Sequence, residues 1–356
     1  MGIERSKHNI AIPPGMTIEE VLENRNMTQK EFAVRMNLSE KHVSQLINGD
    51  VALTPEVADR LARVFGVEAA FWNNLEANYR EMLIKVRREN ELANEINFAI
   101  PFNYDKLAKL GLVMSADTSF QKVDNLHHFF EVTSLQSVFN PALIPVACRH
   151  LTDVEQDKAS LHTIVQFARL EARNIPVHRF LMSKLKQALP KIRSMTGMKF
   201  HDFRIDLEDL LASCGIGLVM VPRLGDLAIN GFAFLDGDKI VIGIIAEDID
   251  SDVFWLSLFH ELAHVLEKHL KKRTPMTMEK EQVAEQVGRE LLVPQSALDI
   301  WLTAHSQTTI TESDIHDFAH ELGVGAGIVV GRLQQDGHIE ADQFNNLKLK
   351  YHVLHN

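Results

Sequence analysis

Cysteine is almost missing from this sequence: Cys148 and Cys214 are the only two among 356 residues, and they lie far apart. Such low usage excludes a disulfide framework and is typical of a reducing cytoplasm. Long apolar runs are missing as well. No window reaches the roughly 18 uninterrupted apolar residues of a membrane helix, and the first residues lack the apolar core of a signal peptide. We therefore expect a cytoplasmic protein without a membrane segment.

An excess of positive charge is also missing, because 37 Lys and Arg stand against 48 Asp and Glu and the formal net charge is −11. Nearly all of the excess negative charge lies after residue 90, since residues 1–90 hold 12 Lys and Arg against 13 Asp and Glu. The acidic balance excludes a protein coated in nucleic acid, but a local basic face in the first part could still meet phosphates. A chain of this length is too long for one core.

Changes in pattern along the chain predict three parts of a mainly α protein with a small α+β part. These are a bundle of short helices over residues 1–90, a helical middle segment over 91–212, and an α+β domain with a C-terminal extension over 213–356.

The first part contains two short helical patterns separated by a tight turn. "TQKEFAVRM" begins at a capping threonine, "NLS" (37–39) forms the turn, and a second helix over about 39–47 is stopped by Gly49. Ala33 is small where the two helices must approach each other. This spacing predicts a helix-turn-helix with the second helix as the recognition helix. The alternative is a small helical bundle with solvated polar faces.

The last part contains apolar, β-branched runs followed by helices. "GIGLVMVP" from residue 215 and the run over 239–245 predict strands, and "SDVFWLSLFHELAHVLEKHL" predicts a helix. The strand at 239–245 could pair with an extended substrate or be an ordinary core strand, and the core interpretation is favoured.

The long apolar helix carries His260, Glu261 and His264 in the order His-Glu-x-x-His. Residues four apart share a helix face, so the two histidines can bind one ion while Glu261 acts on a metal-bound water. Catalytic zinc takes three protein ligands, and the inward face of the next helix offers Glu281 as the third. Glu285, one turn later, could hold a ligand histidine from outside the metal shell. The alternative is two histidines with a chance glutamate.

Residues 215–295 resemble the ImmA/IrrE metallo-endopeptidases through the His-Glu-x-x-His helix, "E-x-x-A" from Glu281 and the later "LLVP". The resemblance implies a zincin-like α+β domain over 213–356, with zinc bound by His260, His264 and Glu281 and with Glu261 as general base. The sequence departs from the family pattern at Ala263, Glu285, Val287 and Gly288. His269 is a candidate for stabilising a transition state, although a solvent-facing histidine is the favoured interpretation.

Residues 10–80 are similar to the HigA antitoxin branch of the XRE helix-turn-helix family, through "MTQKEFAVRMNLSEKHVSQLINGD" with "IPPGMTIEEVLE" before it and "FWNNLEANY" after it. The resemblance implies a homodimer on a palindromic operator. The residues that it places against DNA are Gln29, Ser39, Lys41, Ser44 and Gln45. Glu40 departs from a purely basic recognition surface.

Together these features predict a DNA-binding regulator of antitoxin type whose zinc (Zn2+) endopeptidase-like domain cleaves itself or a partner repressor. A non-catalytic antitoxin that neutralises a toxin by binding, with a structural or sensory His-Glu-x-x-His site, is the alternative. A pure peptidase with a helical scaffold in front is a third hypothesis, and it predicts no sequence-specific DNA binding.

Overall fold

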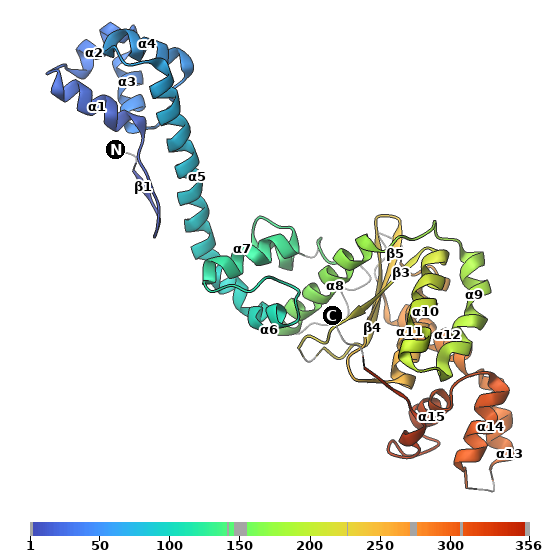
Figure 1. Ribbon diagram of the computed structural model, residues 1–356. Coiled ribbons are helices and arrows are strands. Elements are labelled where there is room, and N and C mark those ends of the chain that lie inside the picture. The colour runs from blue at the N-terminus through green and yellow to red at the C-terminus, as the bar shows by residue number, and fades with distance from the viewer. Residues whose placement is uncertain are drawn as a thin grey trace. The chain divides into compact units, whose positions relative to one another are not determined.

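The computed structural model describes residues 3–140, 142–145, 155–225, 227–270, 276–306 and 309–352, with side chains of the helix that begins at Glu155 described from residue 158 (Figure 1). The chain divides into two compact units, residues 1–98 with 116–124 and residues 99–115 with 125–356. The protein is mostly helical with a small mixed sheet in its C-terminal part, as the sequence predicts. The three-part division at residues 90 and 212 stays a prediction. Among the described residues, no helix has the length and apolar character needed to span a membrane.

The first unit is built from short helices and one two-stranded ribbon. Its elements are β1 (Glu4–Arg5), β2 (Ile10–Ala11), α1 (Pro14–Asn24), α2 (Gln29–Met36), α3 (Glu40–Asn48), α4 (Pro55–Phe65) and the long helix α5 (Ala69–Ala99), which ends at the unit boundary.

Local capping explains where α2 and α3 begin and end. The hydroxyl of Thr28 accepts a hydrogen bond from the Glu31 N–H at 3.1 Å, and the hydroxyl of Ser39 accepts one from the His42 N–H at 3.1 Å. Between the helices Asn37 takes a left-handed conformation (φ 51°), which asparagine tolerates better than most residues. The helix-turn-helix geometry predicted from the sequence is therefore confirmed, with α2 and α3 at the expected residues.

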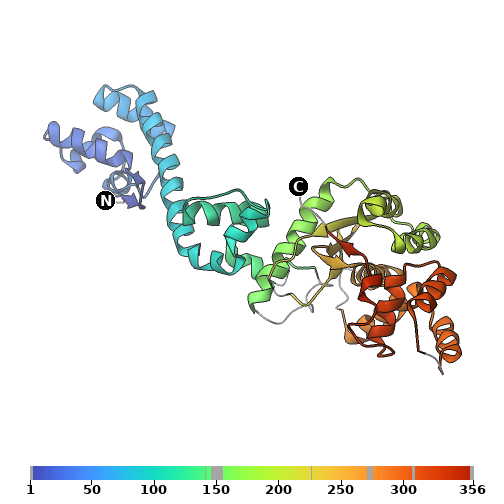
Figure 2. The same ribbon diagram turned by 60° about the horizontal axis from the view of Figure 1, so that its bottom comes forward.

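The core of this bundle is apolar and aromatic. Phe32 of α2 stacks on Phe65 of α4 with ring centroids 5.1 Å apart, and Trp72 at the start of α5 closes the same cluster. Antiparallel β1 and β2 lie along α5 (Figures 1 and 2), where the Glu89 carboxylate accepts hydrogen bonds from Ser6 and Asn9. The helix-turn-helix is thus packed by its own core.

The second unit surrounds a small sheet with helices. Its helices are α6 (Tyr104–Lys109), α7 (Ser119–Phe130, which begins in the first unit), α8 (Glu155–Asn174), α9 (Met182–Ser194), α10 (Phe200–Cys214), α11 (Ser251–Leu266), α12 (Met278–Leu292), α13 (Gln295–Ala304), α14 (Glu312–Leu322) and α15 (Ala326–Gln335). Short 3-10 helices are η1 (Ile100–Phe102), η2 (Leu135–Phe139), η4 (Met195–Gly197) and η5 (Asn345–Leu347).

The sheet has the order β3-β5-β4, from β3 (Ile216–Val221), β4 (Gly231–Asp236) and β5 (Lys239–Ile245). β5 is the central strand, parallel to β3 and antiparallel to β4. The sequence predicts β3 and β5 but not β4. A central strand whose two edges are both paired cannot accept another strand, so the substrate-pairing interpretation of residues 239–245 is wrong and the core interpretation holds.

Both faces of the sheet are covered, which suits the continuous apolar character of β3 and β5. Leu218 and Ile242 face the core that contains α9, α10 and α11. On the opposite face Gly217 lies against Ala172 of α8, and Arg169 of α8 lies over the Phe234 ring. The two views agree that α8 lies on one side of the sheet and α10 and α11 on the other (Figures 1 and 2).

A second small ribbon fixes the start of α11, because β6 (Ile249–Asp250) pairs with β7 (Lys350–Tyr351) directly before that helix. The indole N–H of Trp255 donates to the Tyr351 hydroxyl at 2.9 Å. The ammonium of Lys348 forms a nearly buried ion pair with Asp252 at 2.8 Å. These bonds tie α11, the helix of the His-Glu-x-x-His motif, to the end of the described chain.

Candidate metal centre and nucleic-acid interface

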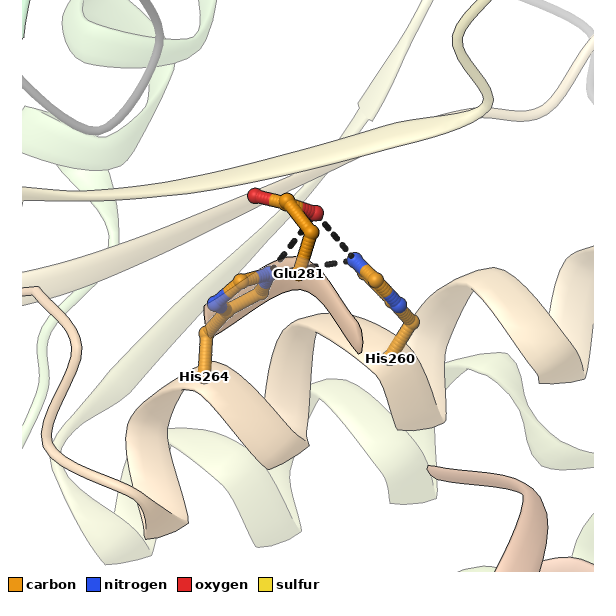
Figure 3. Close-up of side chains that lie close together, drawn as sticks. All are labelled: His260, His264 and Glu281. Carbon is orange, nitrogen blue, oxygen red and sulfur yellow. Dashed lines mark hydrogen bonds and ion pairs between the residues drawn. The ribbon is translucent and has the colours of Figure 1, made fainter. Parts of the chain in front are cut away.

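α11 and α12 bring three metal-ligating side chains together (Figure 3). His260 and His264 lie one turn apart on α11, and Glu281 projects toward them from the first turn of α12. The Nε2 atoms of the two histidines are 3.0 Å apart, and Glu281 Oε2 lies 3.2 Å from His260 Nε2 and 3.5 Å from His264 Nε2. This is the one such group of His, Cys, Asp or Glu found in the parts of the chain that the structure describes, and it could hold a metal ion.

The spacing of these atoms agrees with what a tetrahedral ion requires. Two ligand atoms each about 2.0–2.1 Å from a tetrahedral zinc ion lie about 3.4 Å apart. The three separations in this structure, 3.0, 3.2 and 3.5 Å, lie close to that value. Two imidazoles and one carboxylate are also a ligand set of catalytic zinc sites. The residues present therefore fit a zinc ion in both chemistry and geometry.

The outer nitrogen of His260 faces a carboxylate. Its Nδ1 lies 3.4 Å from Glu285 Oε2, and Glu285 in turn accepts a hydrogen bond from Arg289 Nε at 2.6 Å. Arg289 also donates to Asp336 at 3.0 Å. Burial lowers the pKa of His260, but its hydrogen bonds to Glu281 and Glu285 outweigh this and raise that pKa to about 10.

The same contacts act on Glu285 in the opposite sense. The hydrogen bond from His260, assisted by Arg289 and opposed by partial burial, lowers the pKa of Glu285 to about 2. The carboxylate is therefore held in its charged form beside His260, where the sequence-based hypothesis put it. These side chains form a series of contacts from His260 through Glu285 and Arg289 to Asp336. The sequence predicted only the contact between His260 and Glu285, because Asp336 lies 47 residues beyond Arg289.

The outer nitrogen of His264 has a different neighbour. Its side chain is almost fully buried, and its Nδ1 lies 3.1 Å from Nδ1 of His269. Burial lowers the pKa of His269. His269 is thus partly buried against a metal-ligand candidate, and the expectation of a simple solvent-facing histidine is wrong.

Glu261 points into a cleft of about 420 Å³ that His260, His264 and Glu281 also line. Burial raises the pKa of Glu261 to about 8. One wall of the cleft is β4, the strand missed in the sequence, and a Cβ added at Gly231 would lie 3.2 Å from Glu261 Cγ. The cleft is also lined by apolar side chains, such as Val253 and Leu256 of α11.

The second candidate site is the outer face of α2 and α3 in the first unit. Gln29, Ser39 and Lys41 are exposed, whereas Ser44 and Gln45 are partly buried. The Ser39 hydroxyl oxygen is used as the N-cap of α3, which leaves its hydrogen to donate elsewhere. Gln29 begins α2, Ser39 caps the recognition helix α3, and Lys41, Ser44 and Gln45 lie on α3. Their contacts with DNA stay a prediction.

The comparisons with known proteins concern the first unit. The model of the helix-turn-helix family matches residues 18–72. The uncharacterised HTH-type transcriptional regulator YddM of Escherichia coli strain K12 is 40% identical over 63 residues, which are 18% of this chain and 67% of YddM. The uncharacterised HTH-type transcriptional regulator YbaQ of the same strain is 38% identical over 65 residues, 18% of this chain and 58% of YbaQ.

A solved structure of an addiction module antidote protein of the HigA family from Coxiella burnetii matches 24% of this chain and 94% of its own. The identity is 27% and the TM-score 0.22, which is too low to establish a shared fold. No model of the ImmA/IrrE family matched, so the likeness of residues 215–295 to that family rests on the motif and on the geometry of Figure 3.

Proposed function

This chain belongs to the helix-turn-helix transcriptional regulators, and on that premise we propose that it is an antitoxin-type regulator with a zinc-dependent endopeptidase-like domain. The first unit binds operator DNA as a homodimer through Gln29, Ser39, Lys41, Ser44 and Gln45. The metal site of the second unit cleaves the chain itself or a partner repressor, which switches repression. A regulator of this kind works beside the chromosome, in the cytoplasm.

One observation carries the proposal: the donor atoms of His260, His264 and Glu281 converge to within 3.0–3.5 Å of one another in a cleft that all three residues line. Two imidazoles and one carboxylate that converge on one point offer a ligand set for one divalent ion, which binds them in their deprotonated forms. The neighbour of the His260 imidazole, the Glu285 carboxylate, is also of the kind that orients ligand histidines.

The chemistry that fits this arrangement is hydrolysis of a peptide bond. A bound zinc ion supplies a Lewis acid that polarises a carbonyl and makes water acidic near neutral pH. Glu261, buried beside the ligand histidine, would take up the proton of the attacking water in its ionised form, which the charge of a bound cation would favour against the burial that raises its pKa to about 8. It then gives that proton to the leaving amine, as a general base and acid does.

The cleft favours an extended polypeptide as substrate. β4 is an edge of the sheet, since β5 lies on its other side, and it forms one wall of the cleft. An extended segment that pairs with the edge of a strand would place a peptide bond near the metal-ligand candidates that line the same cleft. Apolar lining residues such as Val253 and Leu256 favour an apolar side chain beside the scissile bond.

The first test is the metal content of the purified chain. We expect about one zinc per wild-type chain, lost in His264→Ala and Glu281→Gln. Glu279→Gln is the matched control, because Glu279 is exposed in the same first turn of α12 and should leave the metal in place. Wild-type protein without zinc, or a Glu279→Gln variant that loses zinc equally, would refute the ligand set.

The second test separates catalysis from binding. Zinc-loaded wild type and Glu261→Gln are incubated alone and with candidate partner repressors, and the fragments are identified by mass spectrometry. A cut by the wild type that disappears in Glu261→Gln, while zinc stays bound, supports the peptidase. No cut in either would favour the alternative, a non-catalytic antitoxin that neutralises a toxin by binding.

Two further observations distinguish the alternatives. A small basic toxin-like protein encoded next to this chain would favour the antitoxin function. A gel shift with the chain's own promoter separates both regulator functions from a pure peptidase, since the latter predicts no sequence-specific shift.

A further inference from the structure

His269 lies one turn beyond the end of α11, and the backbone folds it back onto the helix. Lys268 adopts a left-handed conformation (φ 59°). The His269 N–H then donates to the carbonyl of His264 at 2.9 Å, a bond that spans five residues and closes the helix end. The backbone of His269 is therefore fixed to the very residue whose imidazole is a ligand candidate.

The side chain of His269 also contacts His264. Its Nδ1 lies 3.1 Å from Nδ1 of His264, and the two ring centroids are 5.3 Å apart. The His264 side chain is only 3% exposed, so its Nδ1 has little access to water as another hydrogen-bond partner. A hydrogen bond between two ring nitrogens needs one proton, which either ring can supply.

The other side of His264 decides which ring carries that proton. Its Nε2 faces Glu281 and His260, so a metal ion at this group would be bound through Nε2. A neutral imidazole that binds metal through Nε2 carries its proton on Nδ1. His264 is then the donor and His269 the acceptor, with the His269 proton on its Nε2.

We infer that His269 is a positioning residue for the metal centre: through Nδ1 it accepts the Nδ1–H of His264 and fixes both the tautomer and the ring orientation of that ligand. The inference rests on the proposed function. It gives the two ligand histidines different partners, since His260 faces the charged carboxylate of Glu285 whereas His264 faces a neutral ring.

The test compares an acceptor with an apolar replacement at residue 269. Zinc affinity is measured by competition with a chromogenic chelator for wild type, His269→Leu and His269→Asn. Loss of such an outer partner typically weakens metal binding about 10–100-fold, which is the effect expected of His269→Leu. His269→Asn places a carbonyl oxygen near the position of Nδ1 and should restore most of the affinity. The control is His305→Leu, which should bind zinc as the wild type does. His305 lies at the end of α13, where its ring nitrogen is hydrogen-bonded to the Trp301 carbonyl.

A readout independent of affinity is the tautomer of His264 in the zinc-loaded protein, from its ring 15N chemical shifts. Wild type and His269→Asn should show a single Nδ1–H form, and His269→Leu a shifted or broadened Nδ1 signal. Equal zinc affinity in wild type and His269→Leu overturns the inference, as does an equal loss in His269→Leu and His269→Asn with the fold intact by circular dichroism. Failure of the wild type itself to bind zinc refutes instead the proposed function.

Discussion

A close backbone contact in the helix-turn-helix unit gives its sharpest prediction. Gly15, in the first turn of α1, packs against the backbone of Ile47 in the recognition helix α3. A Cβ placed on Gly15 would lie 2.0 Å from the Ile47 carbonyl oxygen and 2.4 Å from its carbon. An ordinary carbon–oxygen contact is about 3.3 Å or longer, so Gly15→Ala must push α1 and α3 apart by about 1 Å. The obstacle is backbone, so no rotamer change relieves it.

The expected cost follows from two opposed effects. Overpacking costs typically about 1–3 kcal/mol and sometimes more, and a backbone clash this short belongs at the upper end. The better helix propensity of alanine returns up to about 1 kcal/mol. A net loss of about 2 kcal/mol lowers the midpoint of a domain of 60–100 residues by about 8–16 °C. Because α3 moves, operator binding should weaken even at temperatures well below that unfolding midpoint.

The assay is thermal unfolding of the full chain by calorimetry, with hydrogen exchange of the amides in residues 18–72 to assign the transition to the first unit. The matched control is Gly66→Ala at the end of α4, where φ is +74° and no atom lies within 4 Å of the added Cβ. There the penalty is conformational alone, about 1 kcal/mol. A midpoint for Gly15→Ala within 2 °C of the wild type, or above that of Gly66→Ala, would show the helix contact to be wrong.

Three other predictions concern the remaining sites. Gly231→Ala forces the Glu261 side chain to shift by a few tenths of an ångström. Because a general base contributes about 10²–10⁴-fold to the rate, we expect kcat/KM on a peptide substrate to fall about tenfold while the zinc content stays unchanged. An unaltered kcat/KM would contradict this. Lys41→Ala should weaken binding similarly for all DNA sequences and reduce the slope of log affinity against log salt by about one, as measured by fluorescence anisotropy; a loss confined to one sequence would point to base contact instead. Burial lowers the pKa of His162 to about 4, below its unfolded value of about 6.5, so the stability that neutral His162 contributes is complete above pH 6.5 and is lost as the pH falls toward 4. After discounting for partial exposure, the wild type should lose about 1 kcal/mol more than His162→Gln between pH 7 and pH 5 in urea unfolding, and equal losses would refute the assignment.

The parts of the protein that sequence patterns predicted correctly depend on neighbours within one or two helical turns. Thr28 and Ser39 cap α2 and α3 through bonds to residues three positions away, so the positions of the two helices and of the turn between them could be derived from spacing. The same holds for His260 and His264, because four residues on a helix always bring two side chains to one face. Glu281 needed one further assumption, that the next helix returns antiparallel with its apolar stripe inward.

What the sequence could not show depends on contacts between residues far apart in the chain. The run "GFAFLD" of β4 carries no clear alternation, since its two faces both meet apolar neighbours, and its strand form comes from pairing with β5. Whether residues 239–245 form an edge strand or a central strand is likewise decided by two partners, since β3 and β4 pair with the two sides of β5. Neither pattern nor propensity encodes which strands pair.

The surroundings of the metal group have the same origin. His269 meets His264 because a left-handed residue turns the chain back at the end of α11. Glu285 is tied through Arg289 to Asp336, 47 residues further on. The sequence therefore specified which atoms are available as ligands, through short-range helical periodicity. Folding specified how those atoms are oriented, buried and charged, because electrostatic and steric effects act through space between segments that periodicity does not connect.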